Sequence, residues 1–281
     1  MTSRSHPYVI ADVFTDTPLE GNGLAVFTDA GAFDDATMAR LARELNLSET
    51  VFALPPREGG DARIRIFTPA AELPFAGHPV LGSAFVLAGE RETVALETGL
   101  GIVAVELRRD AGGTVCFGRM RQPIPVLEPF EHQEALLRAL GASRSQLAFE
   151  AYLNGPHNVY VMLADEAAVA ALEPNHQALA ALGPFNVSCF AGAGHHFKTR
   201  MFAPAIGVSE DPATGSAAGP LALHLARHGR IAFGEEIEIT QGVEIGRPSK
   251  LYARATGSAE AVESIEVGGA AVIVARGEFS F

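Results

Sequence analysis

The sequence predicts an α+β protein made of two similar lobes. Its 281 residues, 48% of them hydrophobic and 19% charged, are enough for two cores of about 140 residues each. A motif recurs at about half the chain length, and the strand and helix patterns around it are roughly repeated. A solenoid needs at least about three shorter units, so two copies of one fold with pseudo-twofold symmetry fit better.

The repeated motif spans residues 65–87 and recurs at residues 200–225. Both copies read Arg-x-Phe-x-Pro and then Glu-x-Pro-x-x-Gly, and the offset grows from 135 to 138 positions across a three-residue insertion. The closing glycines are Gly77 and Gly215, and an uncharged, apolar segment follows each. The uncharged stretches, 73–89 and 212–226, are shorter than the ~20 residues of a membrane span. They therefore predict two buried helices.

The other elements follow from local patterns. A hairpin is expected from strands 8–14 and 24–27, because Pro18 and Gly21-Asn22-Gly23 form a turn between them. Apolar residues at i, i+3, i+4 and i+7 predict a helix that Asp34-Asp35 begins and Asn46 ends. Similar reasoning predicts strands 50–54, 157–163 and 270–275 and helices 165–172 and 175–182. The final strand can return to either lobe.

The two glycines suggest an anion-binding site. Each lies where a loop enters a helix, and such a helix start offers unpaired N–H groups and about half a positive charge. The next residues, His78 and Ser216, can hydrogen-bond a small carboxylate or phosphate. The alternative is that the glycines only let two core helices pack closely. The duplicated polar entry, with Asp211 beside it, favours the site.

Glu49 is a candidate general acid or base. Its neighbours are apolar or small, and partial burial would raise the pKa of its carboxyl toward neutrality. A surface glutamate at the start of a strand is the alternative.

Composition excludes several classes of function. The formal net charge of -12 disfavours binding to nucleic acid, so small molecules are the expected partners. Lys198 and Lys250 are the only lysines, which argues against a cofactor held as a Schiff base. Cys116 and Cys189 form no CxxC pair, and the N-terminus shows a short polar lead without an export signal. These features predict a protein of the reducing cytoplasm that is not attached to a membrane.

Two histidine patterns raise the question of a metal. His224 and His228 lie one helical turn apart, but Leu225 stands where an HExxH motif has its glutamate. A helix-end role for His228, before Gly229, is therefore preferred, and His195-His196 is expected to be a loop. No metal site is predicted. Fingerprints for nicotinamide, ATP and the serine hydrolases are missing too.

Several segments together resemble the phenazine-biosynthesis isomerase family (PhzF-like), and the resemblance covers essentially the whole chain. They are Asp12-Val13-Phe14, Gly21-Asn22-Gly23-Leu24-Ala25-Val26-Phe27, Leu45-Asn46-Leu47-Ser48-Glu49-Thr50, Phe75-Ala76-Gly77-His78-Pro79 and Glu210-Asp211-Pro212-Ala213-Thr214-Gly215-Ser216. The resemblance implies the diaminopimelate epimerase-like fold, with two lobes that are each a β-barrel-like sheet around a central helix. The expected lobes are residues 1–122, completed by about 265–281, and residues 123–264. It also implies a homodimer with the active site between the lobes.

The resemblance further implies an isomerase of phenazine biosynthesis that needs no cofactor and acts on trans-2,3-dihydro-3-hydroxyanthranilate. Glu49 matches the family's proton-shuttling glutamate. His78 and Asp211 match residues that hold the substrate and assist proton movement. The residues expected around the substrate carboxylate are Gly77, Gly215 and Ser216.

Two rival functions remain. An epimerase or racemase of the same fold typically places a thiol directly before each glycine, but these places hold Ala76 and Thr214. Two-base inversion by thiols therefore lacks its parts. The second rival is a relative that only binds a carboxylate metabolite or a protein partner. Such a protein would tolerate loss of Glu49.

Overall fold

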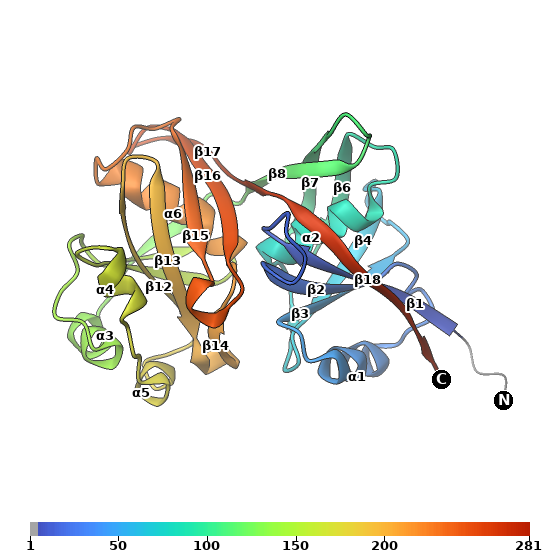
Figure 1. The fold of residues 1–281 in the computed structure, drawn as a ribbon, viewed down its shortest axis with the longest axis horizontal. Helices are drawn as coiled ribbons and strands as arrows, with labels where there is room; N and C mark the ends of the chain where they lie inside the picture. The colour runs from blue at the N-terminus through green and yellow to red at the C-terminus, as the bar shows by residue number, and fades with distance from the viewer. Residues whose placement is uncertain (1–4) are drawn as a thin grey trace. The chain divides into compact units, whose positions relative to one another are not determined.

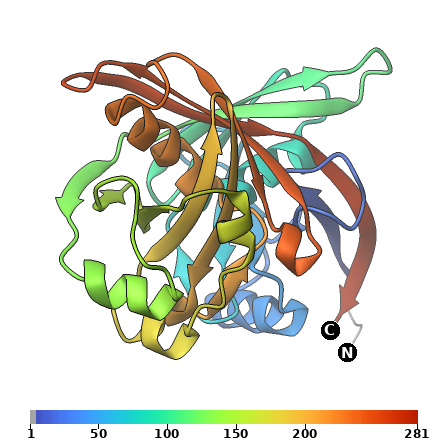
Figure 2. The same ribbon diagram turned by 60° about the vertical axis from the view of Figure 1, so that its left-hand side comes forward.

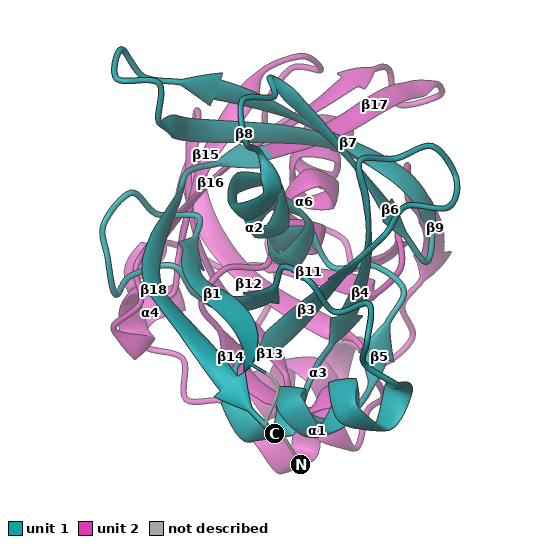
Figure 3. Ribbon diagram, turned by 90° about the vertical axis from the view of Figure 1, so that its right-hand side faces the viewer, with its two compact units in different colours: residues 1–121, 268–281 teal, residues 122–267 magenta. Residues whose placement is uncertain are grey.

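The computed structural model describes residues 5–281, so the polar lead expected for residues 1–4 lies outside the described residues. The chain forms two compact units, one comprising residues up to 121 together with 268–281 and the other residues 122–267 (Figure 3). Each unit combines strands with helices, which confirms the α+β class.

The first unit contains two helices, α1 (Asp35–Leu45) and α2 (Gly77–Leu87). Its strands are β1 (Ser5–Val13), β2 (Asn22–Phe27), β3 (Glu49–Leu54), β4 (Ala62–Phe67), β5 (Glu72–Leu73), β6 (Thr93–Thr98), β7 (Gly101–Arg109), β8 (Val115–Gln122) and β18 (Ala271–Ser280). The pairs β1–β2, β3–β4, β4–β5 and β6–β7 are antiparallel. The pairs β2–β3 and β4–β6 are parallel, because a helix connects the strands of each pair.

The second unit repeats this order of pairings. Its helices are α3 (Gln133–Leu140), α4 (Glu166–Ala170), α5 (His176–Ala180) and α6 (Gly215–Arg227), with short 3₁₀ turns η1 (Pro204–Ile206) and η2 (Val243–Ile245). Its strands are β9 (Val126–Pro129), β10 (Glu150–Leu153), β11 (His157–Met162), β12 (Asn186–Ala193), β13 (His196–Ala203), β14 (Val208–Asp211), β15 (Glu236–Gln241), β16 (Ser249–Gly257) and β17 (Val262–Gly269). Here β10–β11, β12–β13, β13–β14 and β15–β16 are antiparallel, and β11–β12 and β13–β15 are parallel. The two units therefore share one topology, as the internal repeat predicts.

Local signals place α1 as expected. The side chain of Asp34 accepts a hydrogen bond from the backbone N–H of Thr37 at 2.8 Å and so caps the helix start. Asn46 ends the helix in the left-handed conformation, with φ of 50°. Met38, Leu41 and Ala42 form the buried face. Both ends and the buried face of α1 are thus set by residues within its own segment.

The helix α2 is buried almost all round, and Figure 3 shows it among the strands of its unit. It packs against β1, β2, β3, β6, β7 and β18. Gly82 lets it approach the sheet, since a Cβ there would lie 2.6 Å from Val13 and 2.7 Å from Leu24. Throughout residues 5–281, no helix is both long and apolar enough to cross a membrane.

The second buried helix, α6, lies beside β15 and β16 (Figure 1) and contains Pro220. A proline inside a helix has no N–H for the carbonyl four residues earlier, which here belongs to Ser216. The Asn154 side chain donates to this carbonyl at 3.0 Å. Nearby, Tyr160 donates to the carbonyl of Ala217 at 2.7 Å, and Gln122 donates to that of Gly215 at 2.8 Å. The Asn154 side chain thus replaces the donor that Pro220 lacks, and Tyr160 and Gln122 add hydrogen bonds to the neighbouring carbonyls.

Some elements differ from the sequence expectation. The C-terminal strand β18 is longer than expected and pairs antiparallel with β1, so it completes the first unit (Figure 2). The two Ala-rich helices α4 and α5 have only five residues each, although Asp165 and Asn175 cap them as their positions suggest. The sequence patterns predict neither α3 nor the strands β4 to β10 and β12 to β17. Their ends are set mainly by pairing and packing with distant segments.

Candidate active site

The repeated arginine and glutamate form the same ion pair in both units. In the first unit, Arg65 binds Glu72 through two hydrogen bonds of 2.7 and 2.6 Å. In the second, Arg200 binds Glu210 through two hydrogen bonds of 2.9 and 2.8 Å. Each pair joins the strand before the glycine-helix motif to the short strand that leads into it, β4 to β5 and β13 to β14. The repeated ion pair thus holds the short strand that leads to the start of each buried helix.

The first unit places Glu49 next to His78. Glu49 begins β3 and His78 lies in the first turn of α2, and Oε2 of Glu49 lies 3.2 Å from Nε2 of His78. The exposed fraction of the side chains is 14% for Glu49 and 5% for His78. The expected partial burial of the Glu49 carboxylate is confirmed. A carboxylate held in this way against an imidazole has the geometry of an acid–base pair.

Asn22 determines which ring nitrogen of His78 carries the proton. Its side-chain nitrogen lies 3.3 Å from Nδ1 of His78. An amide nitrogen can only donate, so Nδ1 accepts and the ring carries its proton on Nε2, which faces Glu49. Burial lowers the pKa of His78 from 6.5 to about 3, because the charged ring loses its solvation. At neutral pH the His78 ring is therefore neutral, and its Nε2 lies 3.2 Å from the Glu49 carboxylate.

The second unit places Asp211 in a buried network at the end of β14. The hydroxyl of Thr214 donates to Oδ2 of Asp211 at 2.5 Å. The side-chain nitrogen of Gln241 donates to the backbone carbonyl of Asp211 at 2.8 Å and to the Thr214 hydroxyl at 3.0 Å. The Thr199 hydroxyl donates to the Gln241 oxygen at 3.1 Å. These bonds fix the loop that leads into α6.

Neither motif helix has a side-chain cap at its start. Ala76 precedes α2 and Thr214 precedes α6, and neither side chain accepts from the first turn of its helix. By contrast, α1, α4 and α5 each begin with a capping Asp or Asn. Uncapped N–H groups with the positive end of a helix dipole suit a carboxylate ligand. The predicted anion site is therefore chemically possible at both starts.

The structure groups the candidate residues within their units. Glu49, Gly77 and His78 lie together in the first unit, and Asp211, Gly215 and Ser216 lie at one loop-to-helix junction in the second. His228 ends α6, as expected. His195 lies in a turn, but His196 begins β13, so the loop expected for His195-His196 is confirmed for His195 only. The candidate residues themselves come from the elements that the sequence assigned to them.

Sequence reasoning missed the supporting residues Asn22, Thr199, Thr214 and Gln241. The sequence predicts a turn at Asn22 but not its contact with His78. It marks Thr214 as a place without a thiol and as part of the family segment, but not as a partner of Asp211. No local signal marks Gln241, which comes from β15.

Comparisons with known proteins agree with this architecture. Residues 11–277 match the family model described as phenazine biosynthesis-like protein. The chain is 53% identical over 274 residues to a Pseudomonas aeruginosa protein named trans-2,3-dihydro-3-hydroxyanthranilate isomerase, covering 97% of this chain and 98% of the relative. Among solved structures it is similar to a phenazine biosynthesis protein of the PhzF family from Bacillus anthracis, with a TM-score of 0.86, 24% identity and coverage of 98% and 99%.

The fold also extends to more distant enzymes. A hydroxyproline epimerase from Agrobacterium vitis superposes with a TM-score of 0.66 at 14% identity, over 100% of this chain and 92% of that one. This likeness concerns the fold alone. The match over nearly the whole chain and the 53% identity decide the family. The chain belongs to the phenazine biosynthesis-like (PhzC-PhzF) protein family.

Proposed function

We propose that the protein is an isomerase that converts trans-2,3-dihydro-3-hydroxyanthranilate to its ketone isomer in phenazine biosynthesis. The identity of 53% to a protein with this name extends over 97% of the chain, which includes both copies of the repeated motif. The contact between Glu49 and His78 is the structural observation that carries the proposal. It supplies a positioned base, which the reaction requires.

Glu49 is the proposed proton carrier. Its carboxylate takes a proton from C3 of the ring, and the electron pair of that C–H bond shifts into the conjugated system. The protonated Glu49 then returns the proton to another ring carbon, and the resulting enol becomes the ketone. No net proton, oxidant or reductant is consumed. Partial burial keeps water away from the carboxylate while it carries the proton.

His78 and Asp211 are proposed to hold the substrate and to assist proton movement. The low pKa of His78 keeps the ring neutral, so its Nε2–H stabilises negative charge on Glu49 without giving up a full proton. Asp211 is held by Thr214, and it is nearly buried. Gly77, Gly215 and Ser216 are proposed to bind the carboxylate through the helix starts.

The cysteines argue against an epimerase. Cys189 lies buried in β12, and burial raises the pKa of its thiol well above the usual range. Cys116 lies in β8, away from both glycine motifs in the sequence. The positions directly before Gly77 and Gly215 hold Ala76 and Thr214, which cannot act as thiolate bases. A single-base isomerisation does not need thiolate bases at these positions.

The proposal also covers assembly and compartment. The family resemblance supports a homodimer. Within each chain, the two units are the proposed catalytic lobes. Two free cysteines fit a reducing cytoplasm.

The deciding experiment adds purified wild-type protein to trans-2,3-dihydro-3-hydroxyanthranilate and follows the diene absorbance. Glu49→Gln keeps the shape of the side chain but removes the base, so turnover should fall by several orders of magnitude. The exposed Glu44→Gln on α1 serves as the matched control and should keep normal turnover. Near-normal turnover in Glu49→Gln would remove Glu49 from the mechanism. Folded wild-type protein without activity would favour a relative that only binds a carboxylate metabolite.

A further inference from the structure

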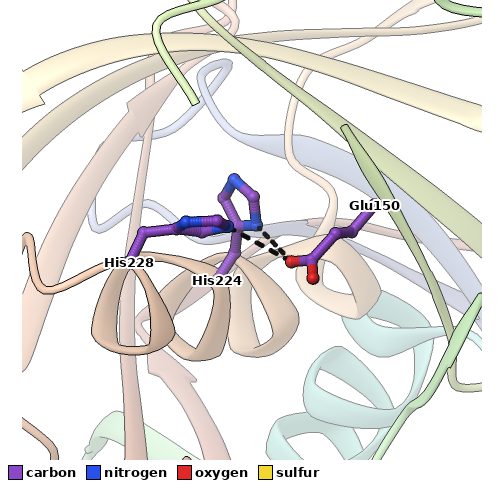
Figure 4. Close-up of side chains that lie close together, drawn as sticks. All are labelled: Glu150, His224 and His228. Atoms are coloured by element: carbon purple, nitrogen blue, oxygen red, sulfur yellow. Dashed lines mark hydrogen bonds and ion pairs between the residues drawn. The ribbon is translucent and has the colours of Figure 1, made fainter. Parts of the chain in front are cut away.

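Three side chains meet at the end of α6 opposite Gly215. Glu150 comes from β10, and His224 and His228 come from the last turn of the helix and its C-terminal cap (Figure 4). Their nearest ligand-type atoms all lie within 4.8 Å of one another. The sequence showed only the histidine pair, and the acidic partner lies far away in the chain. Folding thus brings a possible third ligand to the histidine pair.

The separations between these atoms fit the ligands of a shared metal, although His228 also hydrogen-bonds Glu150 at 3.3 Å. Oε2 of Glu150 lies 3.3 Å from Nε2 of His228 and 3.5 Å from Nδ1 of His224. Hydrogen bonds from ring nitrogens are usually about 2.7–3.2 Å long. Ligand atoms at about 2.0–2.2 Å from a tetrahedral Zn²⁺ are about 3.3–3.6 Å apart. The two separations therefore match neighbouring ligands of one ion.

The surroundings also favour a cation. The His224 side chain is fully buried, while those of His228 and Glu150 are 24% and 25% exposed, which leaves a route for an ion to enter. The carbonyl end of α6 carries partial negative charge. Arg227 lies 3.5 Å from Oε1 of Glu150, the other carboxylate oxygen, so it leaves Oε2 to the proposed ion.

Tyr152 lies beside the same ligands. Its hydroxyl donates to Oε2 of Glu150 at 2.7 Å and therefore accepts from Nδ1 of His224 at 3.0 Å, through a proton that a bound metal ion would displace. Hydroxyls that bind metal ligands from outside orient them and commonly raise metal affinity. The Tyr152 hydroxyl thus orients the Glu150 carboxylate from outside the proposed metal site.

We propose that Glu150, His224 and His228 form a binding site for a divalent transition-metal ion, with Zn²⁺ as the best match. Two imidazoles at i and i+4 of a helix with one carboxylate are a known ligand set for zinc, and they leave a fourth position for water. The proposed site lies nine residues along α6 from Gly215, or about 14 Å at the helical rise. It is therefore separate from the residues proposed for isomerisation, and its expected role is to tie β10 to α6.

The test measures metal binding rather than activity. The protein is stripped with a chelator and equilibrated with Zn²⁺. Bound metal is then analysed, and the affinity is measured by competition with a chromophoric chelator. We expect one ion per chain and a higher thermal midpoint with Zn²⁺ than without. Co²⁺ should give the intense visible spectrum of a tetrahedral site.

The variants use the two partly exposed ligands, because replacing the fully buried His224 risks unfolding. His228→Gln and Glu150→Gln should each weaken binding at least about 100-fold and abolish the thermal shift, while Tyr152→Phe should weaken it about tenfold. The exposed His196→Gln is the matched control and should bind as the wild type does. Binding below one equivalent in the wild type would overturn the proposal. Equal binding in His196→Gln and His228→Gln would also overturn it, since the ion would then be adventitious.

Discussion

Nε2 of His78 lies 3.2 Å from Oε2 of Glu49, and Nδ1 of the same ring lies 3.3 Å from the side-chain nitrogen of Asn22. One neutral ring thus links an amide donor to the proposed base. The carboxylate of Glu49 thus lies against a ring whose other nitrogen is bound by Asn22. It makes Asn22 a positioning residue for the proposed reaction.

Replacing Asn22 with Leu should lower kcat about 10–100-fold with little change in KM. Leucine fills a similar volume but gives no hydrogen bond to Nδ1, so the ring can turn or change its tautomer and misplace its donor to Glu49. Steady-state kinetics measure the split between kcat and KM, and ¹⁵N chemical shifts of the His78 ring report the tautomer. Asn175→Ala, which removes only the cap of α5, should leave kcat unchanged. Unchanged kcat together with an unchanged tautomer in Asn22→Leu would remove Asn22 from the network.

The buried neutral His78 should make the protein less stable as the pH falls. The pKa is 6.5 in the unfolded chain and about 3 in the folded one, so below pH 6.5 the unfolded chain binds more protons. The contribution of the neutral His78 to the free energy of unfolding is complete above pH 6.5 and is lost as the pH falls toward 3. On the order of 1–2 kcal/mol should be lost by pH 5.

Urea unfolding of wild type and His78→Gln at pH 7, 6 and 5 isolates this contribution. The free energy of unfolding of the wild type should fall more steeply than that of the variant, because glutamine does not titrate. Parallel curves for the two proteins would show that His78 charges as easily in the folded state as in the unfolded state.

The two repeated ion pairs should differ in their contribution to stability. The side chains of Arg200 and Glu210 are each 9% exposed, whereas those of Arg65 and Glu72 are 21% and 41% exposed. Arg200 also donates to the carbonyls of Ala170 and Leu172 at the end of α4. Arg200→Met should therefore cost about 3–5 kcal/mol, because it leaves a buried carboxylate and these carbonyls without their donor.

The matched variant Arg65→Met should cost no more than about 1 kcal/mol, since solvent screens the exposed pair. Chemical denaturation of both variants gives the two free energies under one set of conditions. Equal losses would mean that burial does not control the strength of this pair.

The proline in α6 predicts that Pro220→Ala partly offsets the stability lost in Asn154→Ala. Asn154→Ala removes the donor to the Ser216 carbonyl and should cost about 1–3 kcal/mol, because that buried oxygen then has no strong partner. In Pro220→Ala the new N–H at position 220 can bind the same carbonyl. The double variant should therefore lose less stability than the sum of the two single variants, which a double-mutant cycle in urea measures. Strict additivity would show that the two residues serve different groups.

Local signals in the sequence determined the elements whose ends depend on nearby residues. Asp34 and Asn46 bound α1, and the glycines at 77 and 215 open the two buried helices, because caps and helix starts involve contacts within a few positions. The repeat also predicted the shared topology, since similar motifs at similar spacing form similar pairings. The family resemblance named the proposed base Glu49.

Only the tertiary structure decided which distant side chains meet. Asn22 reaches His78, Gln241 reaches Asp211, and Asn154 reaches the carbonyl exposed by Pro220. The histidine pair at the end of α6 gained Glu150 in the same way. A sequence pattern records the period of a helix or strand, but the contact between two elements depends on how their strands pair and their faces pack. The supporting contacts of the site and the proposed metal ligands are therefore products of long-range packing.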